Sequence, residues 1–251
     1  MTSYRALAVV ILAAGQGKRM GNPDLAKVLA PLHGRPLLGY VLDQARALQP
    51  DTIVPIIGHQ REAVRAYVAV ECPEAKCVEQ VEQLGTGHAV QQTKALLGSS
   101  RSDVIILSGD VPLLSSTTLQ QLLQQHREQS ASCTVLTTTV DNPTGYGRII
   151  RSEDGSLLRI VEHKDATPLE QAIREINSGV YVVRSEDLYP ALDLVQNSNA
   201  QGEYYITDII NILQGRGATV IAYHTDDAME VQGINTVSDL ERASELYAQR
   251  S

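Results

Sequence analysis

The segment ALAVVILAAGQGKRMGNPDLAKVL, residues 6–29, predicts the class of fold. It begins as an uninterrupted apolar run, which is typical of a strand buried on both faces of a sheet. The run ends in Gly15 and Gly17, followed by two cations, a proline turn and a further lysine, Lys27. Bare backbone and positive charge directly after a buried strand indicate a loop that receives an anion or a nucleotide.

Further apolar runs along the chain are rich in Val and Ile and are bounded by Gly, Pro, Asp or Ser, as buried strands are. We predict strands in TIVPIIG (52–58), DVIILSGD (103–110), SCTVLTTTV (132–140), GVYVVR (179–184) and ATVIAYH (218–224). Segments with helical spacing lie between and after them: RPLLGYVLDQARAL (35–48), SSTTLQQLLQQHREQ (115–129), EYYITDIINILQG (203–215) and SDLERASELYAQR (238–250). Strands alternating with helices predict an α/β fold, with a mostly parallel sheet covered by helices on both faces.

Residues 141–180 interrupt this alternation. The stretch VDNPTGYGRIIRSEDGSLLRIVEHKDAT, residues 140–167, is rich in turns and holds short strands separated by Gly and Asp-Gly. It predicts a small hairpin-bearing subregion that covers one side of the site. We find no internal repeat, and we expect one domain over residues 1–235, with 141–180 as its substrate-facing subregion and a terminal helix over 236–251.

The composition is that of an ordinary globular protein with a negative balance. The 251 residues are 43% hydrophobic and 20% charged, with a formal net charge of −8. A basic field is what general nucleic-acid or acidic-membrane binding requires, and this chain lacks one. Phe and Trp are absent, which argues against a base-stacking platform for single strands. Any anion must therefore be held by a local group of residues.

The cysteines and the N-terminus indicate a reducing compartment. Cys72, Cys77 and Cys133 have no spacing typical of zinc or of a disulfide framework, so we expect free thiols. The N-terminal apolar run is short and is followed by GQGKR where a cleavage site for a signal peptide would lie. No run approaches the ~18 apolar residues of a membrane span. We expect a cytoplasmic protein with neither a membrane nor a nucleic acid as its partner.

The first loop matches neither standard phosphate-binding motif. Leu12 stands where a Walker A loop has its first glycine, and Arg19 follows Lys18 where Ser or Thr is required. In a dinucleotide-binding fingerprint, Met20 would occupy the third glycine position. A plain glycine turn with solvated cations is the alternative interpretation.

Two more marked loops are expected at the same edge of the sheet. Ser108, Gly109 and Asp110 follow the run VIIL, and a carboxylate there suits Mg²⁺ beside phosphate oxygens; alternatively, Asp110 caps a turn before Pro112. In EQVEQLGTGHA, residues 79–89, backbone amides before a helix suit a nucleobase carbonyl or an anion. The alternative there is helix capping by Thr86.

These three loops together indicate nucleotidyl transfer. A nucleoside triphosphate would lie on the first loop, Arg19 and Lys27 would meet its phosphates, and Asp110 would carry the metal. Such a reaction needs two anions held in line and their charge neutralised, and it needs no nucleophile from the protein. The lack of a Ser-His-Asp or Cys-His motif fits this hypothesis.

Nine motifs extend the pattern over nearly the whole chain: LAAGQGKRM, AKVL, EQLGTGHA, GDVPLL, DNPTGYGRI, IVEHKDAT, EINSGVYV, GEYYITDII and VQGIN. With them the chain resembles the uridylyltransferase domain of the bacterial N-acetylglucosamine-1-phosphate uridylyltransferases, within the sugar-nucleotide pyrophosphorylase superfamily. The first motif is shared by many nucleotidyltransferases. The runs QLGTGHA, PTGYGRI and VEHKDAT are much more specific to this family.

The resemblance implies a Rossmann-like nucleotidyltransferase domain with a mixed, mostly parallel central sheet. It implies a Mg²⁺-dependent reaction of UTP with N-acetylglucosamine 1-phosphate that forms UDP-N-acetylglucosamine and pyrophosphate, a precursor supply for peptidoglycan and lipopolysaccharide. Members of the family are typically bifunctional and trimeric, with a C-terminal acetyltransferase β-helix. This chain has no hexapeptide repeat, so we expect no acetyl transfer, a terminal helix that begins a linker arm, and no assured trimer.

The family's site residues carry over onto matching positions. For the nucleotide they are Leu12, Ala13, Ala14, Gly15, Gln80, Gly85, Thr86, Ser108 and Gly109. For the sugar they are Gly147, Glu162, Asn177, Tyr205 and Thr207. Arg19 and Lys27 match the phosphate-binding cations, and Asp110 with Asn235 matches the Mg²⁺ ligands.

Several of these residues have simpler alternatives. Glu162 could pair with Lys164 on a strand surface, Asn177 could cap a turn, and Asn235 could begin the terminal helix. The chain also departs from the family: Lys18 replaces a usual Thr, Ala26 replaces a common Pro and predicts a looser loop, and Ser108 stands where some members have Tyr. Two rival functions remain open, a related transferase for another sugar or base and a non-catalytic sugar-nucleotide sensor.

Overall fold

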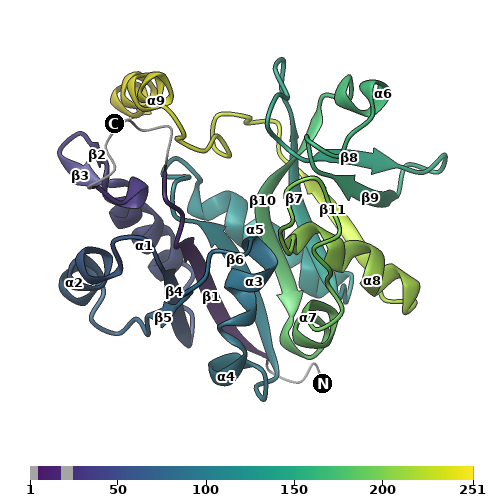
Figure 1. Cartoon of the computed structure of the whole chain (residues 1–251), viewed down its shortest axis with the longest axis horizontal. Helices are drawn as coiled ribbons and strands as arrows, with labels where there is room; N and C mark the ends of the chain where they lie inside the picture. Colours follow the sequence, from purple (N-terminus) through teal and green to yellow (C-terminus); the bar gives the residue numbers. More distant parts are fainter. Residues whose placement is uncertain (1–4, 18–24, 251) are drawn as a thin grey trace.

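The computed structural model describes residues 5–17 and 25–250, and a nine-stranded sheet forms the centre of this part of the chain (Figure 1). Seven strands form the main path in the order β11-β7-β10-β6-β1-β4-β5, with β8 and β9 branching from β10. Their bounds are β1 Ala6–Ala13, β4 Thr52–Ile57, β5 Val78–Glu79, β6 Ser102–Ser108, β7 Cys133–Thr139, β8 Arg148–Arg151, β9 Leu157–Val161, β10 Glu175–Arg184 and β11 Val220–His224.

Strand direction decides which loops meet. β1 runs parallel to β4 and β6, β4 parallel to β5, and β11 parallel to β7. β10 is inserted antiparallel between β6 and β7. The start of β10 therefore lies at the same edge of the sheet as the carboxyl ends of β1, β4 and β6. The predicted fold class, a mixed and mostly parallel sheet with helices on both faces, is confirmed.

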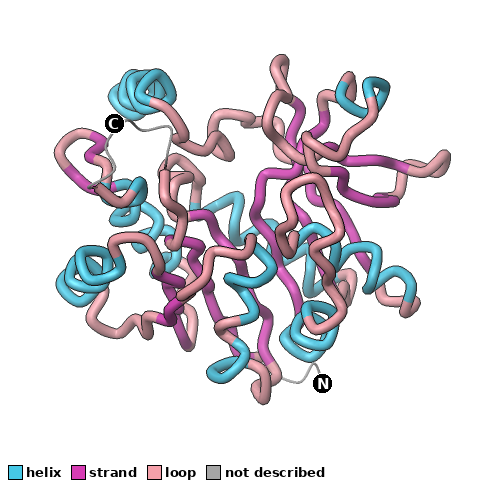
Figure 2. Tube along the Cα trace, in the orientation of Figure 1, coloured by secondary structure: helices cyan, strands magenta, loops and turns pink. Residues whose placement is uncertain are grey.

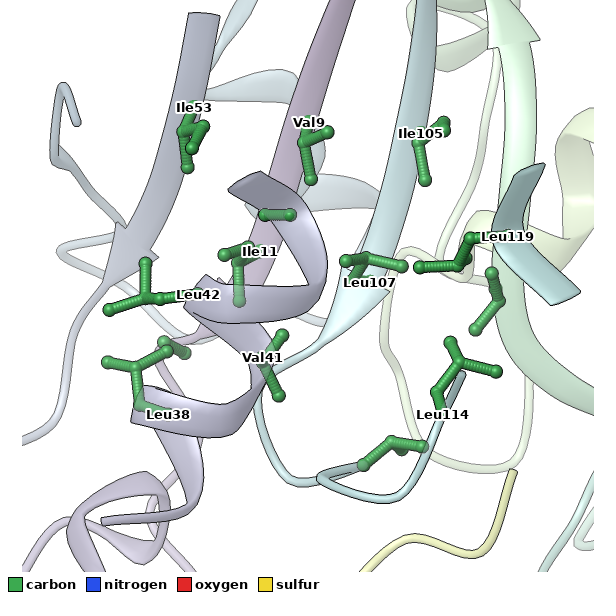
Figure 3. Close-up of a cluster of buried hydrophobic side chains, with 14 of the residues drawn as sticks. Val9, Ile11, Leu38, Val41, Leu42, Ile53, Ile105, Leu107, Leu114 and Leu119 are labelled. Atoms are coloured by element: carbon green, nitrogen blue, oxygen red, sulfur yellow. The ribbon is translucent and has the colours of Figure 1, made fainter. Parts of the chain in front are cut away.

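One face of the sheet is covered by three helices: α1 Leu37–Ala47, α2 Arg61–Glu71 and α5 Ser116–Glu128. Leu38, Val41 and Leu42 of α1 follow the helical spacing seen in the sequence and pack over the strands (Figure 3). On the strands, alternate residues such as Val9 and Ile11 point toward them. α5 begins as predicted, since the Ser115 hydroxyl accepts a hydrogen bond from the amide of Thr118.

The opposite face is covered by four helices: α3 Thr86–Gln91, α4 Lys94–Leu97, α7 Ser185–Leu192 and α8 Ile209–Gly215. Val10, Ile106 and Tyr181 point toward this side, so the strands are buried on both faces. This is why their sequences are continuous apolar runs rather than alternating ones. Figure 2 shows the strands between the helical layers.

The predicted helix over 203–215 is shorter than expected. Its first residues are not helical, a 3₁₀ turn covers Ile206–Asp208, and α8 begins at Ile209. Residues 203–205 instead run along the loop before α3, where Tyr204 bonds the main chain on both sides: its amide donates to Leu84 O at 2.8 Å, and its carbonyl accepts from Gly87 N at 2.8 Å. Tertiary contacts with this loop outweigh the local helical pattern.

Two smaller structures flank the edge of the sheet where the parallel strands end. On one side, α9 Val237–Arg250 packs through Leu240, Ala243 and Tyr247 on a hairpin made by β2 Pro31–Leu32 and β3 Arg35–Pro36. On the other, β8, β9 and α6 Pro168–Gln171 form the hairpin-bearing subregion. In Figure 1 these two structures lie at the upper left and the upper right, and residues 225–236 cross between them.

No helix among the described residues is long and apolar enough to cross a membrane. Cys72, Cys77 and Cys133 are all free, and burial raises the pKa of each thiol. The expectation of unpaired thiols is confirmed.

Candidate active site

A cavity of about 480 Å³ opens at the edge of the sheet where β1 and β6 end. Its lining comes from the three loops marked in the sequence, together with Glu203 and with Asn235 near the start of α9. Ten predicted site residues line it: Leu12, Ala14, Gly15, Lys27, Gln80, Gly85, Thr86, Ser108, Asp110 and Asn235. The parallel strands bring these loops together, as the rule for open α/β sheets predicts.

The turn after β1 presents main chain to this cavity. Gly15 has open space around it, and the Ala13 side chain points away into the core, so contacts there are left to the backbone. Gly17 has a φ of +61°, and a Cβ on it would lie 2.5 Å from the Cβ of Lys27. Glycine is therefore required at this position for Lys27 to pass beside the turn. Gly109 does not line the cavity but packs against the turn, with its amide donating to Leu12 O at 2.9 Å.

Part of the first loop lies outside the described residues. Arg19, predicted to meet the phosphates, falls there, as does Lys18. Ala26 lies just beyond, 1% exposed, with a φ of −58°. Because proline adopts a φ close to this value, Ala26 keeps the backbone conformation that the family's proline would impose.

Lys27, Asp110 and Asn235 meet in the lining of the cavity. The Lys27 Nζ donates to Asn235 Oδ1 at 2.8 Å and forms an ion pair with Asp110 Oδ2. The Lys27 side chain is 13% exposed and that of Asp110 is 19% exposed, so the pair is largely shielded from water. The ammonium thus touches both oxygens that the sequence assigned to a metal.

The residues before α9 fix the position of Asn235. Its amide and that of Thr236 donate to Asp239 Oδ2 at 3.0 and 2.9 Å, and the Thr236 hydroxyl accepts from Asp239 N at 3.1 Å. This is a reciprocal capping arrangement at the start of α9. The amide of Ile234 donates to Asp110 O at 2.9 Å, which ties the two predicted metal ligands together. Asn235 lies two residues before α9, so it does not begin the helix.

The donor set at this point fits Mg²⁺. Asp110 and Asn235 offer hard oxygen ligands, and the position between them already stabilises the positive charge of Lys27. Within residues 5–17 and 25–250 no group of three or more His, Cys, Asp or Glu could hold a metal. The protein would thus supply few ligands, as is usual for Mg²⁺ bound together with substrate phosphates.

The base end of the site, defined as Gln80, Gly85 and Thr86, follows β5 and opens α3. Gln80 is 4% exposed. Gly85 precedes α3 with a φ of +111°, and a Cβ on it would lie 2.6 Å from Tyr204 O. The Thr86 hydroxyl accepts a hydrogen bond from Ile206 N at 3.1 Å and does not cap α3, which rules out the capping alternative.

The sugar end, defined as Gly147, Glu162, Asn177, Tyr205 and Thr207, lies where β10 meets the hairpin-bearing subregion. Asn177 N donates to Gly147 O at 2.9 Å. Thr207 Oγ1 donates to Glu162 Oε1 at 3.1 Å, and Lys164 bonds Gln201 instead, so the proposed Glu162–Lys164 pair does not form. A Cβ on Gly147 would lie 3.6 Å from Glu162 Oε1. These residues, up to 60 positions apart in the chain, form one cluster.

The titratable groups at the sugar end are strongly desolvated. Burial raises the pKa of Glu162, although the hydrogen bond from Thr207 opposes the shift. Burial also raises the pKa of Tyr205 to about 12, and its hydroxyl accepts from Gln201 Nε2 at 2.8 Å. Tyr205 is only 6% exposed, so its bulk supports the segment that carries Thr207.

A bulge in β10 brings the sugar end close to Ser108 at the end of β6. The register shifts between Asn177 and Tyr181, and Gly179 has a φ of +82°. Asn177 Oδ1 accepts a hydrogen bond from Gly179 N at 3.0 Å, so Asn177 does cap a turn, which was the simpler interpretation of this residue. Its Nδ2 donates to the buried Tyr181 hydroxyl at 2.6 Å. A Cβ on Gly179 would lie 3.4 Å from Ser108 Oγ, so the bulge lies beside the end of β6.

Sequence reasoning missed several residues of this region. Gln16, Gln83 and Glu203 also line the cavity. Tyr146 accepts a hydrogen bond from the amide of Gly233, and burial is the main cause that raises its pKa. It thereby links the hairpin-bearing subregion to the segment that carries Asn235. Tyr146 lies inside the motif PTGYGRI, and this motif is the sequence feature that could have pointed to it.

Comparison with known families places the chain among nucleotide-transferring proteins. Residues 9–201 match the model of the MobA-like NTP transferase domain. The chain is 44% identical to the bifunctional protein GlmU of Bacillus licheniformis, over 96% of this chain and 52% of that protein. It is 46% identical to GlmU of Desulfotalea psychrophila, over all of this chain and 73% of that protein. The chain spans about half the length of most of the curated relatives it matches.

Solved structures share the fold at low sequence identity. A UDP-glucose pyrophosphorylase complexed with UDP-glucose superposes with a TM-score of 0.80 at 18% identity, covering 98% of this chain and 100% of the other. A putative glucose-1-phosphate thymidylyltransferase from Bacillus anthracis gives 0.77 at 20% identity, covering 96% and 95% of the two chains. The architecture is thus one that known nucleotidyltransferases use.

Proposed function

Because the chain belongs to the MobA-like NTP transferase family, we propose that it is a uridylyltransferase acting on UTP and N-acetylglucosamine 1-phosphate. Its products would be UDP-N-acetylglucosamine and pyrophosphate. One observation carries the proposal: Lys27, Asp110 and Asn235 contact one another in the lining of the cavity that the glycine turn and the base end also line. The similarity to GlmU proteins at 43–47% identity supports the choice of substrates.

The nucleotide occupies the cavity with its base toward Gln80, Gly85 and Thr86. Main-chain groups from Leu12 to Gly15 approach the ribose and phosphates, because no side chain intervenes at Gly15. Lys27 turns from Asp110 to the phosphates, and Arg19 acts with it. Both cations offset the charge that builds on the leaving pyrophosphate.

Asp110 and Asn235 would hold Mg²⁺, which supplies charge neutralisation and polarises the phosphate oxygens when bound. Asp239 keeps Asn235 in place by accepting a hydrogen bond from the main-chain amide of Asn235. Without a divalent ion, the described lining residues offer one cation, Lys27, against Asp110 and Glu203. The lining therefore does not neutralise two phosphate substrates by itself, which supports a role for a divalent cation when the triphosphate and the sugar phosphate bind together.

The sugar phosphate binds toward Gly147, Glu162, Asn177 and Thr207. The Glu162 carboxylate and the Thr207 hydroxyl are suited to bonding sugar hydroxyls or the acetamido group. An oxygen of the sugar phosphate then attacks the α-phosphorus of UTP in line. The bond from that phosphorus to the bridging oxygen breaks, and its electron pair leaves with pyrophosphate. No covalent bond to the protein forms.

The product would serve cell-wall synthesis, as a precursor for peptidoglycan and lipopolysaccharide. Cytoplasmic placement is part of the proposal and is supported by the three free thiols, which persist in a reducing compartment.

Pyrophosphate release tests the proposal. We expect release from UTP with N-acetylglucosamine 1-phosphate in the presence of Mg²⁺, and little release when Mg²⁺ is left out. Glucose 1-phosphate and CTP serve as the competing sugar and base. Equal rates with glucose 1-phosphate would assign the chain to a related transferase, and tight UDP-sugar binding without release would indicate a sensor.

A further inference from the structure

The Gln80 side chain at the base end is held through its amide nitrogen. Nε2 donates to the Gly85 carbonyl oxygen at 3.0 Å and contacts Nδ1 of His88 at 3.1 Å. A carbonyl oxygen only accepts hydrogen bonds, so the atom that faces Gly85 must be the nitrogen. The second hydrogen of Nε2 then points to His88, whose Nδ1 must accept it.

The Gly85 carbonyl cannot turn away from Gln80, because the loop around it is clamped. With its φ of +111°, Gly85 lies so close to Tyr204 that an added Cβ would be 2.6 Å from the Tyr204 oxygen. On either side, Leu84 O and Gly87 N are bonded to the main chain of Tyr204. The fold therefore supplies one anchor for the Gln80 amide nitrogen, at the Gly85 carbonyl.

His88 also contacts a second glutamine. Gln92 Nε2 lies 3.1 Å from His88 Nε2 and 2.9 Å from the His88 carbonyl oxygen. A neutral imidazole has one N–H, so it can accept from only one of the two amides. Both glutamines also bond a main-chain carbonyl, but Gln92 is only half-buried and can turn its amide toward water, whereas the buried Gln80 cannot. The ring thus accepts from Gln80 at Nδ1 and carries its proton on Nε2.

We propose that His88 is a positioning residue for base selection, holding Gln80 so that it offers the base an acceptor alone. Both hydrogens of Gln80 Nε2 are engaged, which leaves Oε1 as the group that this side chain presents to the cavity. Uracil has an N–H at N3 and can donate to that oxygen. Cytosine has a lone pair at N3, and two acceptors face to face in a desolvated site repel each other. The inference rests on the proposed function, since it specifies how the same site would choose UTP over CTP.

The test is the ratio of kcat/KM for UTP to that for CTP, measured on single preparations of each variant. His88→Ala removes one of the two anchors, so the Gln80 amide can reverse, and we expect the ratio to fall about tenfold. His88→Asn places an amide oxygen near the former Nδ1 and should restore most of the preference. Gln92→Ala, on the other ring nitrogen, should leave the ratio unchanged. A general loss of folded protein slows both nucleotides equally and does not move the ratio.

An unchanged ratio in His88→Ala, or a fall of equal size in His88→Asn, would overturn the inference. If His88→Ala does not fold, His88→Leu fills the space of the ring without an acceptor and should show the same fall. Equilibrium binding of UTP and of CTP separates this inference from the proposed function. Should the wild-type protein release no pyrophosphate, the proposed function fails, while a UTP preference in binding that His88→Ala abolishes still supports the role of His88. Equal wild-type binding of the two nucleotides would refute that role.

Discussion

The base end and the sugar end of the candidate site differ in the part of the chain that makes them. Around the base and phosphates, glycines bring main chain to the surface of the cavity, and Gly17 and Gly85 have conformations that glycine adopts readily. At the sugar end, buried polar side chains such as Glu162 and Thr207 form the surface. At the sugar end, burial raises the pKa of the Glu162 carboxyl, so sugar binding should respond to mild acid.

The largest effect should come from Asp110, which belongs to neither end and pairs with Lys27. We expect Asp110→Ala to keep the fold and to lower kcat by at least about a hundredfold, because one charged contact is lost in a shielded site. Pyrophosphate release measures the loss, and a thermal melt checks the fold. Asp226→Ala, which removes a fully exposed carboxylate, is the matched control and should leave kcat unchanged. Near-normal release from Asp110→Ala would remove this residue from the chemistry.

At the base end, the main chain is the sensitive element. Gly85→Ala forces a side chain onto Tyr204 at a φ of +111°, and we expect it to lower the free energy of unfolding by about 3 kcal/mol. Gly155 also has a positive φ, +82°, but open space surrounds it. We therefore expect Gly155→Ala to lower the free energy of unfolding by only about 1 kcal/mol. Urea titrations of both variants give the difference. Equal losses would mean that the close contact of Gly85 with Tyr204 does not restrict this position.

At the sugar end, the charge of one side chain should matter more than its shape. Glu162→Gln keeps the size of the residue, and we expect the KM for the sugar phosphate to rise about tenfold with a smaller change in the KM for UTP. Glu153→Gln on the turn between β8 and β9 is exposed and serves as the control. A tenfold rise in the KM for UTP as well would show that the two ends are not separate.

The raised pKa of Glu162 also predicts how sugar binding and stability depend on pH. Burial raises the pKa of Glu162, so in the wild type the KM for the sugar phosphate should rise on acidification at a higher pH than an ordinary glutamate would require. A raised carboxyl pKa contributes stability only while the group is protonated, and that contribution is lost as pH rises through the folded-state value. At neutral pH, Glu162→Gln should therefore melt no lower than the wild type. A lower melting temperature would contradict the desolvation of Glu162.

The fold was predictable where one local signal dominates. Apolar runs bounded by turn residues located β1, β4, β6, β7, β10 and β11, but not the two-residue β5. The hydroxyl at Ser115 located the start of α5. The direction of GVYVVR was not readable from its residues, because a strand buried on both faces has the same pattern in either orientation. The non-helical segment at 203–205 was missed because its partners Leu84 and Gly87 are more than a hundred residues away in the chain.

The site was predictable in part. Glycine-rich loops at strand ends indicated the nucleotide side from local sequence alone. The cluster of Glu162, Asn177 and Thr207 has no local spacing to reveal it, since the fold assembles it from three distant segments, and only the family resemblance pointed to those residues. His88 and Asp239 were missed because they act on neighbours, through Gln80 and Asn235, rather than on a ligand.

The contact of Lys27 with both Asp110 and Asn235 has a consequence for the protein at rest. The Lys27 ammonium already neutralises the Asp110 carboxylate before any substrate binds. The affinity of this position for a divalent ion alone should therefore be low. Treatment with a chelator should accordingly leave the melting temperature where it was. The incoming triphosphate, by drawing the ammonium toward itself, would open the place for the ion it brings along.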